Sequence, residues 1–283
     1  MAFVSSDPSR FWCGNGIPYE VADDIFLDDA AKEIVRNAVD TWNSIISDHN
    51  ITALRLFARF QEEIQPDYLV FTKHPTACSS GIGRQGGPQL VRCPIGGAGQ
   101  GSSGGVMHEI GHAAGFQHEQ CRPDRGQKIT IMWDNIEPGK EGNFCREIPD
   151  GQVIGEYDYG SIMHYGTHYF STNNLATIVP TDPNAVIGQR VAPSPGDIQA
   201  MGGLCVNVPY VQEIPPATAA QRLRDIGLIP SFTGDPHGTF VWQQSPRSGR
   251  VVGRGTVVTL QLRKGQIQVL PPLAFNILEA KFN

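Results

Sequence analysis

Residues 108–118 read HEIGHAAGFQH, and they place three histidines and one glutamate at spacings typical of a catalytic metal site. A helix through the first five of these residues puts His108 and His112 one turn apart on the same face. Gly115 suits the left-handed conformation that ends a helix, so the chain after it would return His118 to the same point. The stretch therefore predicts one Zn²⁺ ion per chain, bound by three neutral imidazoles with one coordination position open.

Glu109 lies beside the predicted ligands and supplies the base that hydrolysis requires. An open position on zinc holds a water molecule, and the metal lowers the pKa of that water to about 7. Glu109 would take the proton of this zinc-bound water, and the resulting nucleophile would attack a peptide carbonyl. A lone histidine or glutamate has simpler explanations, but the added glycine and third histidine at set offsets make a chance match rare.

A second segment, SIMHYG at residues 161–166, has the form of the turn that gives the metzincin peptidases their name. Together with the run HEIGHAAGFQHEQCRPDR at residues 108–125, it closely resembles the astacin family of zinc endopeptidases. The longer motif of that family adds four residues, all of which are present here: Phe116, Glu119, Arg122 and Asp124.

The resemblance implies a role for each residue of the site. The metal ligands would be His108, His112 and His118, with Glu109 as general base and acid. Met163 would pack beneath the metal as a hydrophobic base, with Gly115 and Glu119 in supporting positions. Tyr165 matches a fifth metal ligand that swings away when substrate binds and then helps to hold the oxyanion. The alternative for Tyr165 is a core tyrosine in a turn.

The match extends over residues 10–207. Phe11–Tyr19 (FWCGNGIPY) resembles the first strand near the astacin amino terminus, and Gly83–Gly87 (GRQGG) resembles a segment of bacterial members that precedes the zinc helix. Gly126 is a departure, because the family commonly has an acidic residue there. The implied fold is α+β and metzincin-type, with an upper twisted sheet, an active-site helix and a lower irregular and helical subdomain.

Composition excludes two classes of partner. The chain has 283 residues, 40% of them hydrophobic, a formal charge of -6 and a pI near 5.7. It has no cluster of basic residues, which argues against nucleic-acid binding. It also lacks an apolar stretch of about eighteen residues, so we expect no membrane span.

The six cysteines form no C-x-x-C pair, and disulfides are the natural interpretation. The astacin resemblance implies a Cys78–Cys93 bond. Cys121–Cys145 and Cys13–Cys205 are then plausible further pairs, with buried thiols as the alternative. No signal peptide is visible at the start of the sequence, since it lacks a basic and an apolar region. Cysteine usage nevertheless favours a secreted, extracellular protein, in one interpretation associated with the cell wall.

Hydrophobic periodicity predicts the main elements. An amphipathic helix is expected over residues 30–48 with Asp28 or Asp29 as its cap, and strands over 54–60 and 68–71. Residues 197–201 predict the last helix of the peptidase. Beyond it, a helix is expected over 217–226 and short strands over 240–244 and 257–262.

Residues 208–265 resemble a PASTA domain, a small α+β module. The resemblance rests on Gly227-Leu228, Gln244-Ser245-Pro246 and Gly255-Thr256, among others. We therefore expect a peptidase domain at 1–207, a PASTA-like module at 208–265 and a tail of unknown role at 266–283. PASTA modules are associated with peptidoglycan binding, which would make peptidoglycan a partner. The alternative is an appendage that only spaces or stabilises the peptidase.

Two functions from different classes follow. The first is a secreted zinc endopeptidase acting on protein or peptide substrates. The second is a cell-wall or peptidoglycan-binding surface protein with a structural or vestigial zinc site, against which the retained Glu109 argues. Arg190 lies where astacins shape the pocket for acidic residues after the scissile bond. It is a weak candidate for the substrate pocket, and a surface arginine is the alternative.

Overall fold

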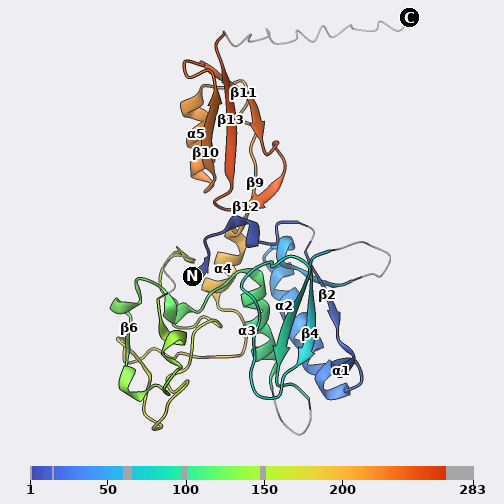
Figure 1. Ribbon diagram of the computed structural model, residues 1–283, viewed down its shortest axis with the longest axis vertical. Helices are drawn as coiled ribbons and strands as arrows, with labels where there is room; N and C mark the ends of the chain where they lie inside the picture. The colour runs from blue at the N-terminus through green and yellow to red at the C-terminus, as the bar shows by residue number, and fades with distance from the viewer. Residues whose placement is uncertain (1, 15, 60–65, 97–100, 147–150, 266–283) are drawn as a thin grey trace, which may run out of the picture. The chain divides into compact units, whose positions relative to one another are not determined.

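The computed structural model describes residues 2–14, 16–59, 66–96, 101–146 and 151–265 (Figure 1). The chain divides into two compact units. The first unit consists of Met1–Asn207 and Val251–Thr256, and the second of Val208–Arg250 and Val257–Asn283. Residues 251–256 fall inside the predicted 208–265 module, yet they belong to the first unit because their strand pairs there. The predicted tail at 266–283 lies outside the described residues.

A parallel sheet forms the upper part of the first unit. Its strand order is β3-β2-β4-β5. The strands are β2 (Ile17–Val21), β3 (Leu56–Ala58), β4 (Tyr68–Lys73) and β5 (Pro88–Cys93). The strands expected at 54–60 and 68–71 correspond to β3 and β4, and residues 60–65 lie outside the described part of the chain. Parallel sheets need cover on both faces, and helices supply it here.

Helix α2 (Asp29–Asp48) confirms the expected amphipathic helix, and it follows the short α1 (Asp23–Phe26). The side chain of Asp28 caps α2 by accepting a hydrogen bond from Ala31 N at 3.0 Å. Its buried face includes Val35 and Trp42. The indole Nε1 of Trp42 donates to Leu54 O at 2.9 Å, so the helix is tied to the segment that leads into β3.

Helix α3 (Ser103–Ala114) carries the first part of the zinc motif and lies between the sheet and the lower segments (Figure 1). Ser102 caps it through a 3.2 Å bond from Gly105 N. Gly115 ends it with a φ of 113°, the conformation that favours glycine. Gly104 allows close packing near the helix start, because a Cβ there would lie 1.6 Å from Arg190 O.

Short elements make up the lower part of the first unit, as expected for an irregular and helical subdomain. The turns are η3 (Glu119–Cys121), η4 (Arg125–Gln127), η5 (Trp133–Asn135) and η6 (Glu141–Phe144). Two antiparallel pairs join β1 (Ala2–Ser5) to β7 (Gly151–Ile154) and β6 (Ile129–Ile131) to β8 (Ile178–Pro180). The predicted last helix is α4 (Pro195–Gly203). A separate core cluster holds this part together and includes Phe144, Tyr157 and Tyr165.

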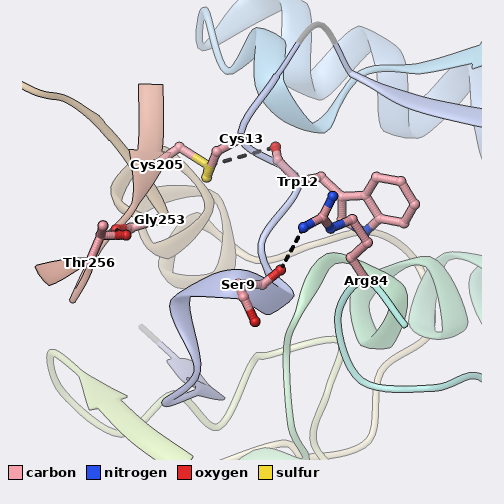
Figure 2. The surroundings of a disulfide bond; sticks show 7 residues. All are labelled: Ser9, Trp12, Cys13, Arg84, Cys205, Gly253 and Thr256. Carbon is pink, nitrogen blue, oxygen red and sulfur yellow. Dashed lines mark hydrogen bonds between the residues drawn. A yellow bond between two sulfur atoms is a disulfide. The ribbon is translucent and has the colours of Figure 1, made fainter. Parts of the chain in front are cut away.

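One of the three expected disulfides is present. Cys13 is bonded to Cys205, with the two Cα atoms 5.5 Å apart (Figure 2). Cys13 follows the turn η1 (Pro8–Arg10), and Cys205 begins β9 (Cys205–Asn207).

The expected Cys78–Cys93 and Cys121–Cys145 bonds are wrong for this structure. Cys78 and Cys93 are thiols that hydrogen-bond to each other. The Sγ of Cys121 donates to Asn143 O at 3.5 Å, and the Sγ of Cys145 donates to Glu141 O at 3.7 Å. Each of these two thiols is thus directed to a backbone carbonyl instead of to the other sulfur.

The second unit packs one helix on a three-stranded sheet, as expected. Helix α5 (Pro216–Asp225) contacts the sheet, whose order is β10-β13-β11. The strands are β10 (Ile229–Gly234), β11 (Phe240–Ser245) and β13 (Val257–Arg263). Leu223 of the helix and Val258 and Leu260 of β13 are buried between the two layers. Among the described residues, no helix is long and apolar enough to cross a membrane.

Candidate metal centre

The three motif histidines converge on one point. His108 and His112 project from adjacent turns of α3, with ring centroids 4.7 Å apart. Beyond the turn at Gly115, the Nε2 atom of His118 lies 3.3 Å from that of His108 and 3.1 Å from that of His112. All three side chains are placed to offer a ligand atom to a common metal ion.

The outer ring nitrogens of two ligands are bound to backbone carbonyls. Nδ1 of His108 lies 2.7 Å from Ile162 O, and Nδ1 of His112 lies 2.8 Å from Phe116 O. A carbonyl accepts but does not donate, so both contacts assign the proton to Nδ1. The lone pair of each Nε2 atom is therefore directed to the centre of the cluster, as a metal site requires.

The cluster fits zinc in both distance and charge. Nitrogen ligands at 2.0–2.1 Å in a tetrahedral shell are about 3.3–3.4 Å apart, close to the observed separations of 3.3 and 3.1 Å. Burial lowers the pKa of His112 to about 4 and holds the pKa values of His108 and His118 well below their ordinary range. All three imidazoles are thus neutral at pH 7, the state that binds a metal ion.

Glu109 is buried beside the histidines with one carboxylate oxygen unsatisfied. The residue is 3% exposed, and within the described chain its Oε2 atom has no hydrogen-bond partner. Burial raises the pKa of Glu109 to about 9 in the protein alone. A bound cation acts in the opposite direction and favours the carboxylate. An unpaired buried carboxylate is costly, which fits a group reserved for a proton transfer.

A cavity of about 630 Å³ brings the predicted residues together. Its lining includes Glu109, Tyr165 and Arg190 as well as the three histidines. The guanidinium Nη1 of Arg190 donates to His164 O at 2.9 Å and to Gln189 O at 2.7 Å. Arg190 is therefore held at the cavity wall, and it is not a freely moving surface side chain.

Met163 packs under the zinc helix. It is 1% exposed, and a Cβ at Gly111 would lie 2.6 Å from its sulfur. Gly111 thus gives the sulfur room between the turns that carry His108 and His112. The backbone of the methionine turn also supports the site, because Ile162 supplies the carbonyl that binds His108.

Asp197 of α4 anchors the methionine turn, a role that the sequence reasoning missed. Its carboxylate accepts hydrogen bonds from Ser161 Oγ at 2.7 Å and Ile162 N at 2.9 Å. The same carboxylate completes a capping box with Ser194. The Ser-x-x-Asp spacing signals the cap, although no local signal indicates the bonds to the distant turn.

Tyr165 lies against the third ligand. Its ring centroid is 4.4 Å from that of His118, and its backbone N donates to Gln120 Oε1 at 3.1 Å. Burial raises the pKa of Tyr165 above its ordinary value, so the phenol remains a proton donor at neutral pH. Gln120 is a further supporting residue that the sequence reasoning did not identify.

A buried ionic network lies directly behind His118. Glu119 and Arg122 are both fully buried, with Nη1 of the arginine 3.1 Å from Oε1 of the glutamate. Arg122 also binds both carboxylate oxygens of Asp124, at 2.9 and 2.7 Å, and the backbone oxygens of Gly155 and Glu156. Burial raises the pKa of Glu119 to about 8, against the opposing effect of the Arg122 charge.

A zinc helix with a third histidine beyond a glycine turn, placed over a buried methionine, defines the metzincin class of zinc peptidases. Comparison with known families agrees. Residues 4–204 match the astacin peptidase family, and residues 206–264, here called the PASTA segment, match the PASTA domain. The chain belongs to the astacin family and is a zinc metalloendopeptidase by class. The predicted family, module and fold are thereby confirmed.

Several relatives show the same pattern. Tolloid-like protein 1 from Homo sapiens is 39% identical over 204 residues, which cover 69% of this chain and 19% of the relative. Bone morphogenetic protein 1 from Xenopus laevis is 38% identical over 202 residues, covering 69% and 27%. The chain thus spans less than a third of the length of these relatives. Among solved structures, high choriolytic enzyme 1, a hatching enzyme zinc-protease from Oryzias latipes, is 33% identical with a TM-score of 0.54, covering 69% of this chain and 94% of that one.

Proposed function

We propose that this chain is a secreted endopeptidase that hydrolyses peptide bonds in protein or peptide substrates, with Glu109 as general base and acid. The observation that carries the proposal is the unpaired Oε2 of Glu109, buried next to three converging imidazoles in one cavity. The extracellular location rests on family membership and on the Cys13–Cys205 disulfide, a bond typical of oxidising compartments.

The donor set would hold one zinc ion through His108, His112 and His118, and that ion would supply Lewis-acid activation of water and of the scissile carbonyl. Glu109 would accept the proton of the attacking water and pass it to the leaving amine. The phenol of Tyr165, protonated and aimed into the same cavity, would donate a hydrogen bond to the developing oxyanion. His108 and His112 are oriented for this by the carbonyls that bind their Nδ1 atoms.

The segment next to the site offers a backbone edge for an extended peptide. Ser79 exchanges two backbone hydrogen bonds of 2.9 Å with Arg92 of β5, and Cys78 and Ser80 on either side line the cavity. Backbone groups alternate in direction along a strand, so those of the two flanking residues are directed away from β5. We propose that the substrate adds to this edge as a further strand.

The second candidate function is binding to the cell wall. The match of residues 206–264 to a PASTA domain favours peptidoglycan as a partner of that segment. It does not compete with proteolysis, because Glu109 and the open cavity belong to the other unit. Sedimentation with purified peptidoglycan, run beside a protease assay, separates the two: binding without zinc-dependent hydrolysis would leave only the second function.

The change Tyr165→Phe is expected to lower kcat by about 10²–10³-fold with little change in KM, because a donor to the oxyanion acts only in the transition state. The measurement is steady-state kinetics on a fluorogenic peptide. Tyr68→Phe removes the same hydroxyl outside the cavity and serves as the control. Equal rates for the two variants would remove Tyr165 from the mechanism.

The change Arg190→Gln is expected to reduce any preference for Asp or Glu after the scissile bond by about 10–100-fold, the value of one charge-assisted hydrogen bond. Arg190→Lys retains the charge and should keep part of the preference. Cleavage-site profiling on a peptide library measures both. A wild-type profile that is indifferent to acidic residues would exclude Arg190 as the selecting group.

A further inference from the structure

The last turn of the zinc helix is bound by residues from the amino-terminal segment. The indole Nε1 of Trp12 donates to Ala113 O at 2.8 Å, next to the ligand His112. Gly83 N donates to His112 O at 2.8 Å. Carbonyls at the end of a helix lack partners within that helix, so these two donors satisfy groups that would otherwise be exposed or unpaired.

Phe11 packs against the turn that redirects the chain to His118. A Cβ at Gly115 would lie 3.0 Å from both Cδ1 and Cε1 of the Phe11 ring. Phe11 and Trp12 are 4% and 6% exposed. The two aromatic side chains therefore contact the part of the chain that sets the direction of two metal ligands, His112 before the turn and His118 after it.

The opposite side of Phe11 is covered by strand β12 (Val251–Gly253). A Cβ at Gly253 would lie 3.0 Å from Cδ2 of the ring and 2.3 Å from Pro8 O. Gly253 is buried, and its backbone leaves no room for a side chain. The ring of Phe11 thus lies between two glycines, one at the end of the zinc helix and one in β12.

Both β12 and the aromatic pair are fastened to the same strand. β12 pairs antiparallel with β9, with Gly253 opposite Cys205, and Arg254 N donates to Leu204 O at 2.8 Å. Cys205 is bonded to Cys13, which directly follows Trp12 (Figure 2). The Sγ of Cys205 also lies 3.6 Å from Trp12 O. Arg84 connects the third side, through Arg84 N to Arg10 O at 2.7 Å and Nη2 to Ser9 O at 3.2 Å.

We infer that Phe11 and Trp12 are positioning residues of the metal centre, and that β12 and the Cys13–Cys205 disulfide hold them there. β12 lies within the PASTA segment, so residues from that segment contribute to metal binding in the peptidase unit. A shift of the last turn would move His112 relative to His108, and a shift of Gly115 would move His118. The inference rests on the proposed zinc site.

Two substitutions in the full chain test this positioning role. Gly253→Ala inserts a Cβ against Pro8 O and the Phe11 ring, whereas Gly203→Ala adds the same methyl group where no atom lies within 4 Å. Trp12→Phe keeps a ring but removes the bond to Ala113 O. Loss of an outer-shell partner typically reduces metal affinity by about 10–100-fold. We expect that loss for Gly253→Ala and Trp12→Phe, and no more than about a threefold change for Gly203→Ala.

The measurements are the zinc dissociation constant, by competition with a chromophoric chelator, and the visible absorption spectrum of the Co²⁺-substituted protein. A shifted Co²⁺ spectrum reports altered ligand geometry, which a loss of stability alone would not produce. If Gly253→Ala does not fold, Trp12→Phe and the double change Cys13→Ser with Cys205→Ser decide the question. Wild-type zinc affinity and Co²⁺ spectra in the folded variants would overturn the inference.

These readouts are independent of peptide hydrolysis. A wild-type protein that binds zinc tightly but cleaves no peptide would contradict the proposed function while the variants still test the positioning role. A wild-type protein that cleaves peptides, with Gly253→Ala equal to Gly203→Ala in zinc affinity and Trp12→Phe equal to wild type, would contradict only the positioning role.

Discussion

Replacing Glu109 with glutamine is expected to lower kcat for peptide hydrolysis by about 10²–10⁴-fold, the usual contribution of a general base. The amide has nearly the same size and fits the same buried position, but it has no basic oxygen to accept the proton of the attacking water. The three imidazoles are untouched, so the variant should still bind one zinc ion. The unpaired Oε2 of Glu109 in the cavity is the reason for expecting a large effect.

Casein digestion and zinc content, measured on the same preparations, test the Glu109→Gln prediction. Glu141→Gln makes the same change at an exposed position and is the matched control. Full activity in Glu109→Gln would remove Glu109 from the mechanism. Loss of zinc along with activity would instead mean that the carboxylate supports the metal centre.

The change Arg122→Ala is expected to destabilise the peptidase unit by about 3–5 kcal/mol, the usual cost of removing one partner of a buried ion pair. The guanidinium is fully buried and binds Glu119, Asp124 and two backbone oxygens. Without it, the buried carboxyl of Glu119 loses its cationic partner, and the two carbonyls lose their donor. Because this network directly follows His118, the third ligand should also become less well ordered.

Urea unfolding of the zinc-loaded protein, followed by intrinsic fluorescence, measures the effect. Arg36→Ala removes an arginine from the exposed face of α2 and should change the free energy of unfolding by no more than about 0.5 kcal/mol. If Arg122→Ala were as stable as Arg36→Ala, the network would contribute nothing to holding the turn after the metal ligands.

Local signals predicted the centre of the site. The ligands His108 and His112 lie within one helix, and the turn at Gly115 is a short-range backbone property, so their arrangement follows from sequence spacing. The helices α2 and α5 were also predicted from periodicity to within a residue or two at their ends. The cap of α2 is Asp28, one of the two expected residues.

Long-range support was not predictable from spacing. Asp197 binds the methionine turn across 35 residues, Gln120 binds Tyr165 across 45, and Trp12 binds Ala113 across 101. Each bond joins a common polar side chain to a backbone group that leaves no mark on the sequence. A return of residues 251–256 to the peptidase unit is equally invisible, because β12 has the composition of any short strand.

The cysteines illustrate the same limit. An even count predicts disulfides but does not decide the pairs. Cys13–Cys205 is present although 192 residues separate its partners, while Cys78 and Cys93, much closer in sequence, remain thiols. Pairing depends on the approach of two Cβ atoms, which spacing along the chain does not determine.

Removal and return of zinc tests the central claim most directly. The chain is treated with a chelator, dialysed, and assayed for peptide hydrolysis as zinc is added back. The account predicts that the metal-free protein is inactive and that activity returns to a plateau at one equivalent of zinc per chain. Full activity in the metal-free protein, or zinc binding at one equivalent with no return of hydrolysis, would contradict it.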